Sequence, residues 1–154
     1  MNDRPTPRAL LLAPCGLDCA RCAVFRHGEI GELAGRLREL MGGYGRLARM
    51  RAQEVPVLAD YPRFEAVLEE LSRPACPGCR EEGTRCPLSN CLARDCVKER
   101  GVDFCFQCAD YPCAAQFAGM EKLRAAWLAK NGRMKAVGVE RFLEEQEGEP
   151  RYPG

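Results

Sequence analysis

The residues of this sequence with the greatest capacity for chemistry are its eleven cysteines, in a chain of 154 residues. They are Cys15, Cys19, Cys22, Cys76, Cys79, Cys86, Cys91, Cys96, Cys105, Cys108 and Cys113. An odd number cannot pair completely into disulfides within one chain. The first residues lack the pattern of a secretory signal, so we expect a mature start and a reducing compartment, where clustered cysteines bind metal or act in catalysis. We predict that all eleven are metal ligands.

Two C-x2-C pairs give the clearest spacing signal. Cys76-Pro-Gly-Cys79 and Cys105-Phe-Gln-Cys108 each place two thiols on one turn of backbone, from which both sulfurs can reach a zinc ion at about 2.3 Å. The Pro-Gly inside the first pair favours that turn. The pairs are farther apart than in the simplest zinc ribbon, and Cys86, Cys91 and Cys96 lie between them. The pattern predicts a four-sulfur zinc site with a second site interleaved.

The triplet Cys15-x3-Cys19-x2-Cys22 has the spacing with which radical S-adenosylmethionine enzymes bind three corners of a four-iron cluster. Those enzymes build a large barrel from strand–helix repeats, whereas the rest of this chain shows helices and cysteines. We therefore expect three ligands that a fourth residue completes. His27, the only histidine, is one candidate. Cys113 is the other, because it follows Pro112 at a predicted helix start, where the helix dipole favours a thiolate.

Composition says little about partners. The 23 basic and 22 acidic residues nearly cancel, so there is no overall basic excess of the kind that accompanies nucleic-acid binding. The longest apolar run, residues 9–13, is far too short to span a membrane. We expect a cytoplasmic protein without nucleic-acid or membrane partners, while a protein partner stays possible and the oligomeric state open.

Apolar spacing and punctuation by glycine and proline predict six helical stretches and one strand. The first helix covers 29–41, and its spacing of three and four residues puts Ile30, Leu33, Leu37, Leu40 and Met41 on one helical face. Further helices are expected over 44–53, from Pro62 with Phe64, Val67, Leu68 and Leu71 on one face, over 92–100 closed by Gly101, after Pro112, and around Phe142 and Leu143. The helix after Pro112 should carry Cys113, Phe117, Met120, Leu123 and Trp127 on one core stripe and break at Asn131-Gly132. Leu10-Leu11-Leu12 fits a short strand.

These elements predict a mainly α fold. We expect a small metal-stabilised domain, with helices packed around an irregular cysteine-rich module like a zinc knuckle. Residues 1–154 should form a single domain with four consecutive parts. They are an N-terminal cysteine motif over 1–28, a helical segment over 29–73, a metal module over 74–113 and C-terminal helices over 114–147.

Three stretches taken together resemble a known family. They are Cys15-Gly-Leu-Asp-Cys-Ala-Arg-Cys22, then Cys76-Pro-Gly-Cys79 through Cys91-Leu-Ala-Arg-Asp-Cys96, and Cys105-Phe-Gln-Cys-Ala-Asp-Tyr-Pro-Cys113, and the ending Gly138-Val-Glu-Arg-Phe-Leu-Glu-Glu-Gln146 fits too. The chain is similar here to the cysteine-rich family called domain of unknown function 3795, from about residue 13 to 147. The resemblance implies a small cytoplasmic protein that binds zinc or iron–sulfur through ten of these cysteines. Cys86 fits the family pattern least well, and the pattern has no histidine at the position of His27.

The sequence carries no catalytic motif, because it contains no phosphate loop, GxSxG elbow or HExxH helix and only one histidine. Asp18 and Asp110 fit capping or turn roles better than acid–base catalysis. We therefore favour a non-enzyme, a zinc-stabilised interaction or adaptor module with one to three zinc ions. The alternative is an iron–sulfur redox or sensor protein with a 4Fe-4S cluster on the Cys15, Cys19 and Cys22 triplet. Metal storage ranks last, because it needs labile, exposed thiolates.

Overall fold

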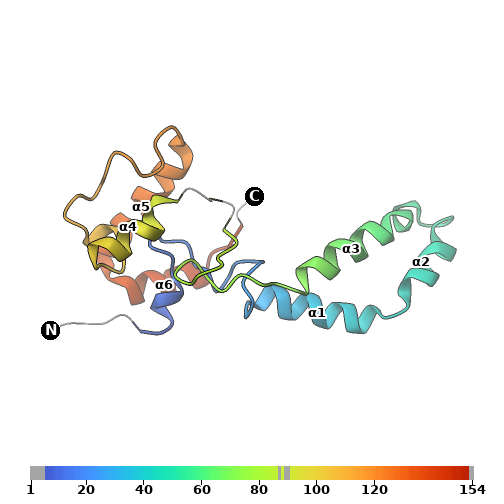
Figure 1. The fold of residues 1–154 in the computed structure, drawn as a ribbon. Helices are drawn as coiled ribbons and strands as arrows, with labels where there is room; N and C mark the ends of the chain where they lie inside the picture. Colours follow the sequence, from blue (N-terminus) through green and yellow to red (C-terminus); the bar gives the residue numbers. More distant parts are fainter. Residues whose placement is uncertain (1–5, 87, 89–90, 153–154) are drawn as a thin grey trace. The chain divides into compact units, whose positions relative to one another are not determined.

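The computed structural model describes residues 6–86, 88 and 91–152. It divides the chain into two compact units, one formed by the residues up to Ala20 and from Pro77 onward, the other by Arg21–Cys76. The predicted fold class is confirmed at the coarse level, since 54% of the chain is helical and the described residues contain no strand. The predicted single domain stays a prediction, and each unit is described by itself (Figure 1).

The second unit is helical throughout most of its length. It contains α1 (Glu29–Met41), α2 (Tyr44–Arg51), the 3-10 helix η2 (Pro56–Asp60) and α3 (Tyr61–Leu71). Helices α1 and α3 lie side by side (Figure 1). A Cβ atom at Gly31 would stand 2.5 Å from Cγ of Pro74, so only glycine allows this close approach. The observed bounds confirm the predicted helices over 29–41, 44–53 and from Pro62 to within two residues.

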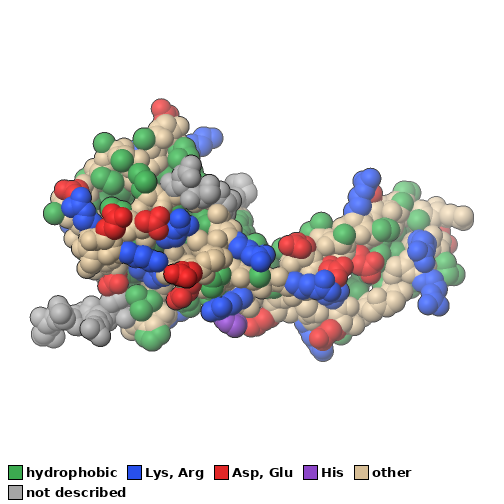
Figure 2. Space-filling model, in the orientation of Figure 1, with side chains coloured by type: hydrophobic (Ala, Val, Ile, Leu, Met, Phe, Trp, Pro, Cys, Tyr) green, Lys and Arg blue, Asp and Glu red, His purple; other side chains and the backbone are tan. Residues whose placement is uncertain are grey.

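The apolar face predicted for the first helix is largely exposed, so it is not the face on which α1 packs. Leu33, Leu37 and Leu40 are 61%, 40% and 69% exposed, while α1 buries Gly31 and Ala34. Two helices approach most closely where their side chains are small, and here that requirement outweighs the area of the leucines. On α3, Leu68 is buried, but Phe64 and Val67 of the same predicted face are exposed. Hydrophobic side chains therefore appear on the surface of this unit, among interspersed basic and acidic ones (Figure 2).

The described residues of the first unit form five helical elements. They are the 3-10 helix η1 (Ala9–Leu11), α4 (Leu92–Arg100), the 3-10 helix η3 (Cys105–Gln107), α5 (Glu121–Val137) and α6 (Val139–Glu147). One part of its core joins η1, α5 and α6 through Ala9, Leu12, Phe104, Met134, Phe142 and Leu143. In the part of the chain that the structure describes, no helix has both the length and the apolar character that a membrane span needs.

The other part of this core contains the cysteines themselves. Cys15, Cys19 and Cys105 are buried together with apolar residues of the N-terminal loop, α4 and α5. The full set is Ala13, Cys15, Cys19, Ala93, Val97, Cys105, Phe117 and Trp127. Thiols therefore stand where a domain of this size would ordinarily place larger aliphatic side chains.

Three local predictions for this unit are wrong. Leu10-Leu11-Leu12 is not a strand, because Ala9–Leu11 form a 3-10 turn and Leu12 alone makes an antiparallel bridge, with Asp18. Residues 113–120 are not helical, and α5 begins only at Glu121. Phe117 has φ +58° and Gly119 φ +74°, which interrupts any helix between Pro112 and α5.

The predicted break at Asn131-Gly132 is also wrong, because α5 continues to Val137. The Asn131 side chain is fully buried, and its amide donates to the carbonyl oxygen of Trp127 one turn earlier. Its Oδ1 accepts the backbone N–H of Phe106 at 3.0 Å. Tertiary hydrogen bonds thus compensate for the low helix propensity of asparagine.

Candidate metal centre

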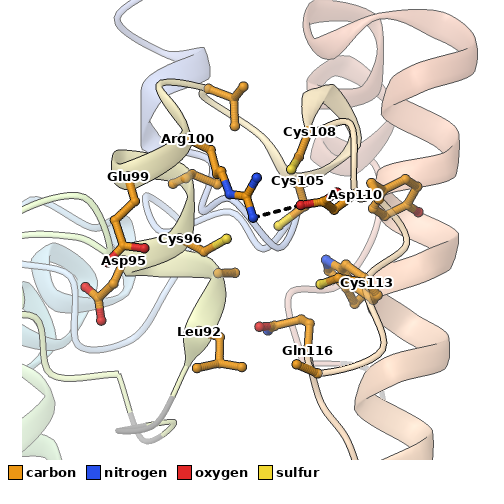
Figure 3. Close-up of a pocket in the computed structure, with 16 residues that line it drawn as sticks. Leu92, Asp95, Cys96, Glu99, Arg100, Cys105, Cys108, Asp110, Cys113 and Gln116 are labelled. Atoms are coloured by element: carbon orange, nitrogen blue, oxygen red, sulfur yellow. Dashed lines mark ion pairs between the residues drawn. The ribbon is translucent and has the colours of Figure 1, made fainter.

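Four cysteines line one pocket of the first unit, which we call the sulfur pocket. They are Cys96, Cys105, Cys108 and Cys113, and the pocket has a volume of about 370 Å³. Cys96 comes from α4, Cys105 and Cys108 from η3 and its end, and Cys113 from the segment before α5. Their sulfurs approach from different sides of the pocket and point into it (Figure 3).

Helix α4 positions Cys96 on the wall of this pocket. Ala93 and Val97 are buried and fix the helix to the core, which leaves Cys96 on the adjoining face. The helix ends at Gly101, whose left-handed backbone (φ +65°) lets its N–H donate to the carbonyl oxygen of Lys98. The predicted helix over 92–100 and its glycine cap are both confirmed.

The turn between Cys105 and Cys108 is held by side chains of the protein itself. Oε1 of Gln107 accepts the N–H groups of Asp103 and Phe104, each at 2.9 Å. Asn131 of α5 accepts the N–H of Phe106 inside the turn, and the Cys108 N–H donates to the Cys105 carbonyl at 3.1 Å. Both thiols of this C-x2-C pair therefore line the same pocket, while their binding of one ion stays a prediction.

Cys113 is held by an arginine of α5. Nη1 of Arg124 donates to the carbonyl oxygen of Cys113 at 2.9 Å and to that of Gln116 at 2.7 Å. The same guanidinium lies over the Trp127 ring, 5.4 Å from its centroid. Since Cys113 is not at a helix start, the predicted effect of a helix dipole on its thiol has no basis in this fold.

Two buried polar groups near the pocket have no partner among the described atoms. Trp127 and Gln116 are each 2% exposed, and indole Nε1 of Trp127 and Oε1 of Gln116 lack hydrogen bonds. Burial raises the pKa of the Cys105 thiol to about 11, and the nearby Trp127 N–H acts in the opposite direction. An unpaired buried donor costs about 1–3 kcal/mol, and a charged sulfur on Cys105 would provide its acceptor.

The rim of the pocket is charged, whereas its walls are apolar. Arg100 and Asp110 form an ion pair of 2.8 Å between α4 and the segment after η3 (Figure 3). Asp95 and Glu99 stand on the same rim, and Leu92 and Val102 belong to the walls. Asp110 is thus a partner in an ion pair, consistent with the structural role that the sequence suggested for it.

A second group of sulfurs surrounds a much smaller space, which we call the small cavity. It has a volume of about 30 Å³ and is lined by Cys15, Cys79, Cys86 and Cys91. Its remaining lining is Ala13, Pro14, Leu17, Leu88 and Arg94. Burial raises the pKa of Cys15 to about 12.

Cys19 stands beside this cavity, hydrogen-bonded through its sulfur to Cys79. That hydrogen bond lowers the pKa of Cys19 to about 7 and raises the pKa of Cys79, because a Cys79 S–H donating to a Cys19 thiolate favours this arrangement of the proton. Two thiols of the predicted N-terminal triplet therefore lie with the later cysteines of the chain.

Cys22 and Cys76 belong to the second unit. The Cys76 N–H donates to the Val24 carbonyl at 2.8 Å, and the Cys76 carbonyl accepts from Arg26 at 2.9 Å. His27 is exposed, with its ring 6.0 Å from that of Phe25. Cys22 of the predicted triplet and Cys76 of the predicted Cys76–Cys79 pair lie in this unit, while the other members lie in the first unit. That the members of either group bind one metal therefore stays a prediction.

No group of three or more histidine, cysteine, aspartate or glutamate side chains within residues 6–86, 88 and 91–152 has the geometry to hold a metal ion. The sulfurs of the sulfur pocket surround a space rather than meet at a point. Sequence reasoning selected the cysteines, but it missed the residues that hold them. Arg124, Asn131 and Gln107 carry no spacing signal relative to the cysteines.

Comparison with known proteins gives one result. A family model described as "Protein of unknown function (DUF3795)" matches residues 11–118, so the chain belongs to this family. This confirms the resemblance, although the C-terminal stretch 138–146 lies beyond the matched range. No curated protein and no solved structure matches the chain.

Proposed function

We propose that this member of the DUF3795 family binds an iron–sulfur cluster in the sulfur pocket, through Cys96, Cys105, Cys108 and Cys113, and uses it for electron transfer or sensing. The observation that carries the proposal is that four thiols from separate segments surround one pocket of about 370 Å³. Four thiolates bind a four-iron cluster at its corners, whereas a single tetrahedral ion draws all four sulfurs to within about 2.3 Å of one point. The sulfurs here lie around a volume, which suits the cluster.

The surroundings of the sulfurs support the same group. Reduction potentials of such clusters depend on hydrogen bonds to the sulfurs and on solvent exposure. The Trp127 N–H lies near Cys105 and could donate such a hydrogen bond to its sulfur. Apolar walls from α4 and Val102 would limit water at the cluster, and the Arg100–Asp110 ion pair lies on the rim.

When bound, the cluster would supply one-electron chemistry. The protein residues would hold it and set its surroundings. Gln107, Asn131 and Arg124 fix the backbone on which three of the ligands stand. Because these contacts involve no metal, the site is preorganised before a cluster arrives.

The zinc-stabilised adaptor is a second candidate, and one observation favours it. The second unit exposes large apolar side chains on α1 and α3, including Leu33, Leu40 and Val67. Exposed apolar groups of this size are typical of surfaces that bind a protein partner. In this case the sulfur pocket would hold zinc and only stabilise the fold.

Paired cysteine variants test the cluster proposal. The protein is purified without oxygen, and its visible absorption is compared with that of Cys105→Ser and Cys22→Ser. We expect a brown protein whose absorption near 400 nm falls at least about fivefold in Cys105→Ser and persists in Cys22→Ser. A cluster on the N-terminal triplet would give the reverse result. A colourless native protein that contains zinc would contradict the cluster and favour the adaptor.

A further inference from the structure

We infer that the small cavity is a second and separate metal site, for one tetrahedral thiolate-bound ion of the zinc class, with Cys15, Cys79, Cys86 and Cys91 as its ligands. These residues are distinct from the four of the sulfur pocket. The inference therefore goes beyond the proposed cluster and does not depend on it.

The size of the cavity selects its occupant. Its volume of about 30 Å³ is enough for one atom or one water molecule and far below that of the sulfur pocket. A water molecule needs two to four polar partners, and apart from Arg94 this lining offers thiols and apolar groups. Thiols are weak hydrogen-bond donors and acceptors, but they are the preferred ligands of soft and borderline cations.

The ligands come from fixed segments. The backbone of the N-terminal loop closes on itself, with the Ala13 N–H donating to the Leu17 carbonyl at 2.8 Å. The carboxylate of Asp18, 4% exposed, accepts from Arg8 and from the Ala20 N–H, which holds the loop that carries Cys15. Cys91 is the N-cap of α4, and its sulfur accepts a hydrogen bond from Nε2 of Gln116 at 3.8 Å.

An arginine joins the Cys79 segment to the rest of the site. Arg80 donates from Nε to the carbonyl oxygens of Leu10 and Leu12, at 3.0 and 3.1 Å, and from Nη2 to that of Asp103 at 2.7 Å. The guanidinium also covers the Phe104 ring at 4.9 Å. These four contacts fix the residue that follows Cys79, so the thiol has a defined position.

The charges around the cavity suit a tetrathiolate ion. Four thiols that bind one divalent cation release four protons, and the product carries a net charge of about −2 without any change in oxidation state. Arg94 lines the cavity and Arg80 directly follows one ligand, so two cations stand where this charge would appear. Binding requires the four side chains to turn toward the centre of the cavity, because they are not at ligand distance in the described structure.

Cobalt(II) is the probe that tests this inference, because tetrahedral cobalt–thiolate centres absorb strongly between about 600 and 750 nm. The full chain carrying Cys105→Ser and Cys108→Ser, which disables the sulfur pocket, is reduced and titrated with cobalt(II) without oxygen. We expect one cobalt per chain with this absorption. Failure of the cluster proposal would change the iron content of the native protein and leave this cobalt titration unaffected.

Ligand variants separate a lost site from a lost fold. In the same background, Cys86→Ser changes a residue outside the helices and should weaken cobalt binding at least about tenfold while the helical circular dichroism is unchanged. The matched control is Cys22→Ser, which should bind cobalt as before. Absence of cobalt absorption in the folded background protein, or equal binding after Cys86→Ser, would overturn the inference.

Discussion

The sulfur pocket and the small cavity are lined by the same kind of side chain, yet they differ in volume more than tenfold, about 370 against 30 Å³. The pocket has a charged rim with the Arg100–Asp110 ion pair, whereas the cavity has one charged lining residue, Arg94. Cysteine content therefore indicates that metal chemistry is available, and the space among the sulfurs determines which metal group fits. We infer a cluster in the first place and a single ion in the second.

The supports of the two places differ as well. Around the pocket, side chains of α5 hold the cysteine-bearing loops through Asn131 and Arg124. Around the cavity, Cys86 stands outside the helices, and the loop near Cys15 is held by the Arg8–Asp18 ion pair and by Arg80. The metal should therefore matter more for folding at the cavity than at the pocket.

Metal removal should produce the largest effect and separate the two places. Extraction of the ion from the small cavity should destabilise the first unit by about 4 kcal/mol, the stabilisation that a bound ligand supplies at about a thousand times its Kd. Oxidative loss of the cluster should cost much less, since protein contacts already hold the pocket. Thermal unfolding followed by circular dichroism, after each treatment, measures both. Equal destabilisation by the two treatments would contradict the difference.

Asp18→Asn should affect the cavity and leave the pocket intact. The substitution removes the charge that pairs with Arg8, and for a buried carboxylate with a partly exposed partner we expect a loss of about 2 kcal/mol. Urea unfolding measures the change. Cobalt binding to the Cys105→Ser, Cys108→Ser background should weaken in parallel, while iron content of the otherwise native protein stays constant. A loss of iron with unchanged cobalt binding would contradict the prediction that Asp18 acts on the small cavity and not on the sulfur pocket.

Trp127→Phe should act on the pocket alone. The ring is retained and the indole N–H near Cys105 is lost, so the thiolate loses a donor worth about 1 kcal/mol. For a one-electron couple this corresponds to a reduction potential lower by about 40 mV, measured by redox titration. Trp127 is the only tryptophan, so a cluster bound beside Cys105 should quench the tryptophan fluorescence of the native protein. This quenching provides a second readout. An unchanged potential would exclude the hydrogen bond.

Glu145→Gln should have the smallest effect and serve as a reference for both places. Glu145 of α6 pairs with Arg133 of α5 at 2.8 Å, and this hydrogen bond lowers the pKa of the carboxyl. A depressed pKa in the folded state stabilises the protein above the usual carboxyl pKa of about 4.3, and the effect disappears as the pH falls through the lower folded value. The melting temperature should fall by about 1 °C at pH 7 and not at all at pH 2.5. Any change in metal content would indicate a coupling that the fold does not explain.

Much of the fold follows from local signals in the sequence. Glycine and proline punctuate the helices, so the bounds of α1, α2 and α4 were predictable to within two residues and the start of α3 to within one. The packing face of α1 was not, because Gly31 permits a close contact with Pro74 that outweighs the leucine stripe. The spacing of apolar residues also could not predict the backbone between Pro112 and α5, since Phe117 adopts φ +58° in response to tertiary packing.

The candidate sites divide in the same way. Residue type selected the cysteines, and Cys105 and Cys108, which the spacing paired, line one pocket. Spacing did not pair Cys15 with Cys91 or Cys96 with Cys113, because loops of irregular conformation bring them together. Cys86, the weakest match to the family pattern, lies on the small cavity.

The most direct test is the content of iron, acid-labile sulfide and zinc in protein purified without oxygen. If the sulfur pocket holds a four-iron cluster and the small cavity holds one zinc ion, each chain should contain about four iron, four sulfide and one zinc. Two or more zinc ions with no iron or sulfide would contradict the account, because the sulfur pocket and the small cavity would then hold the same kind of ion.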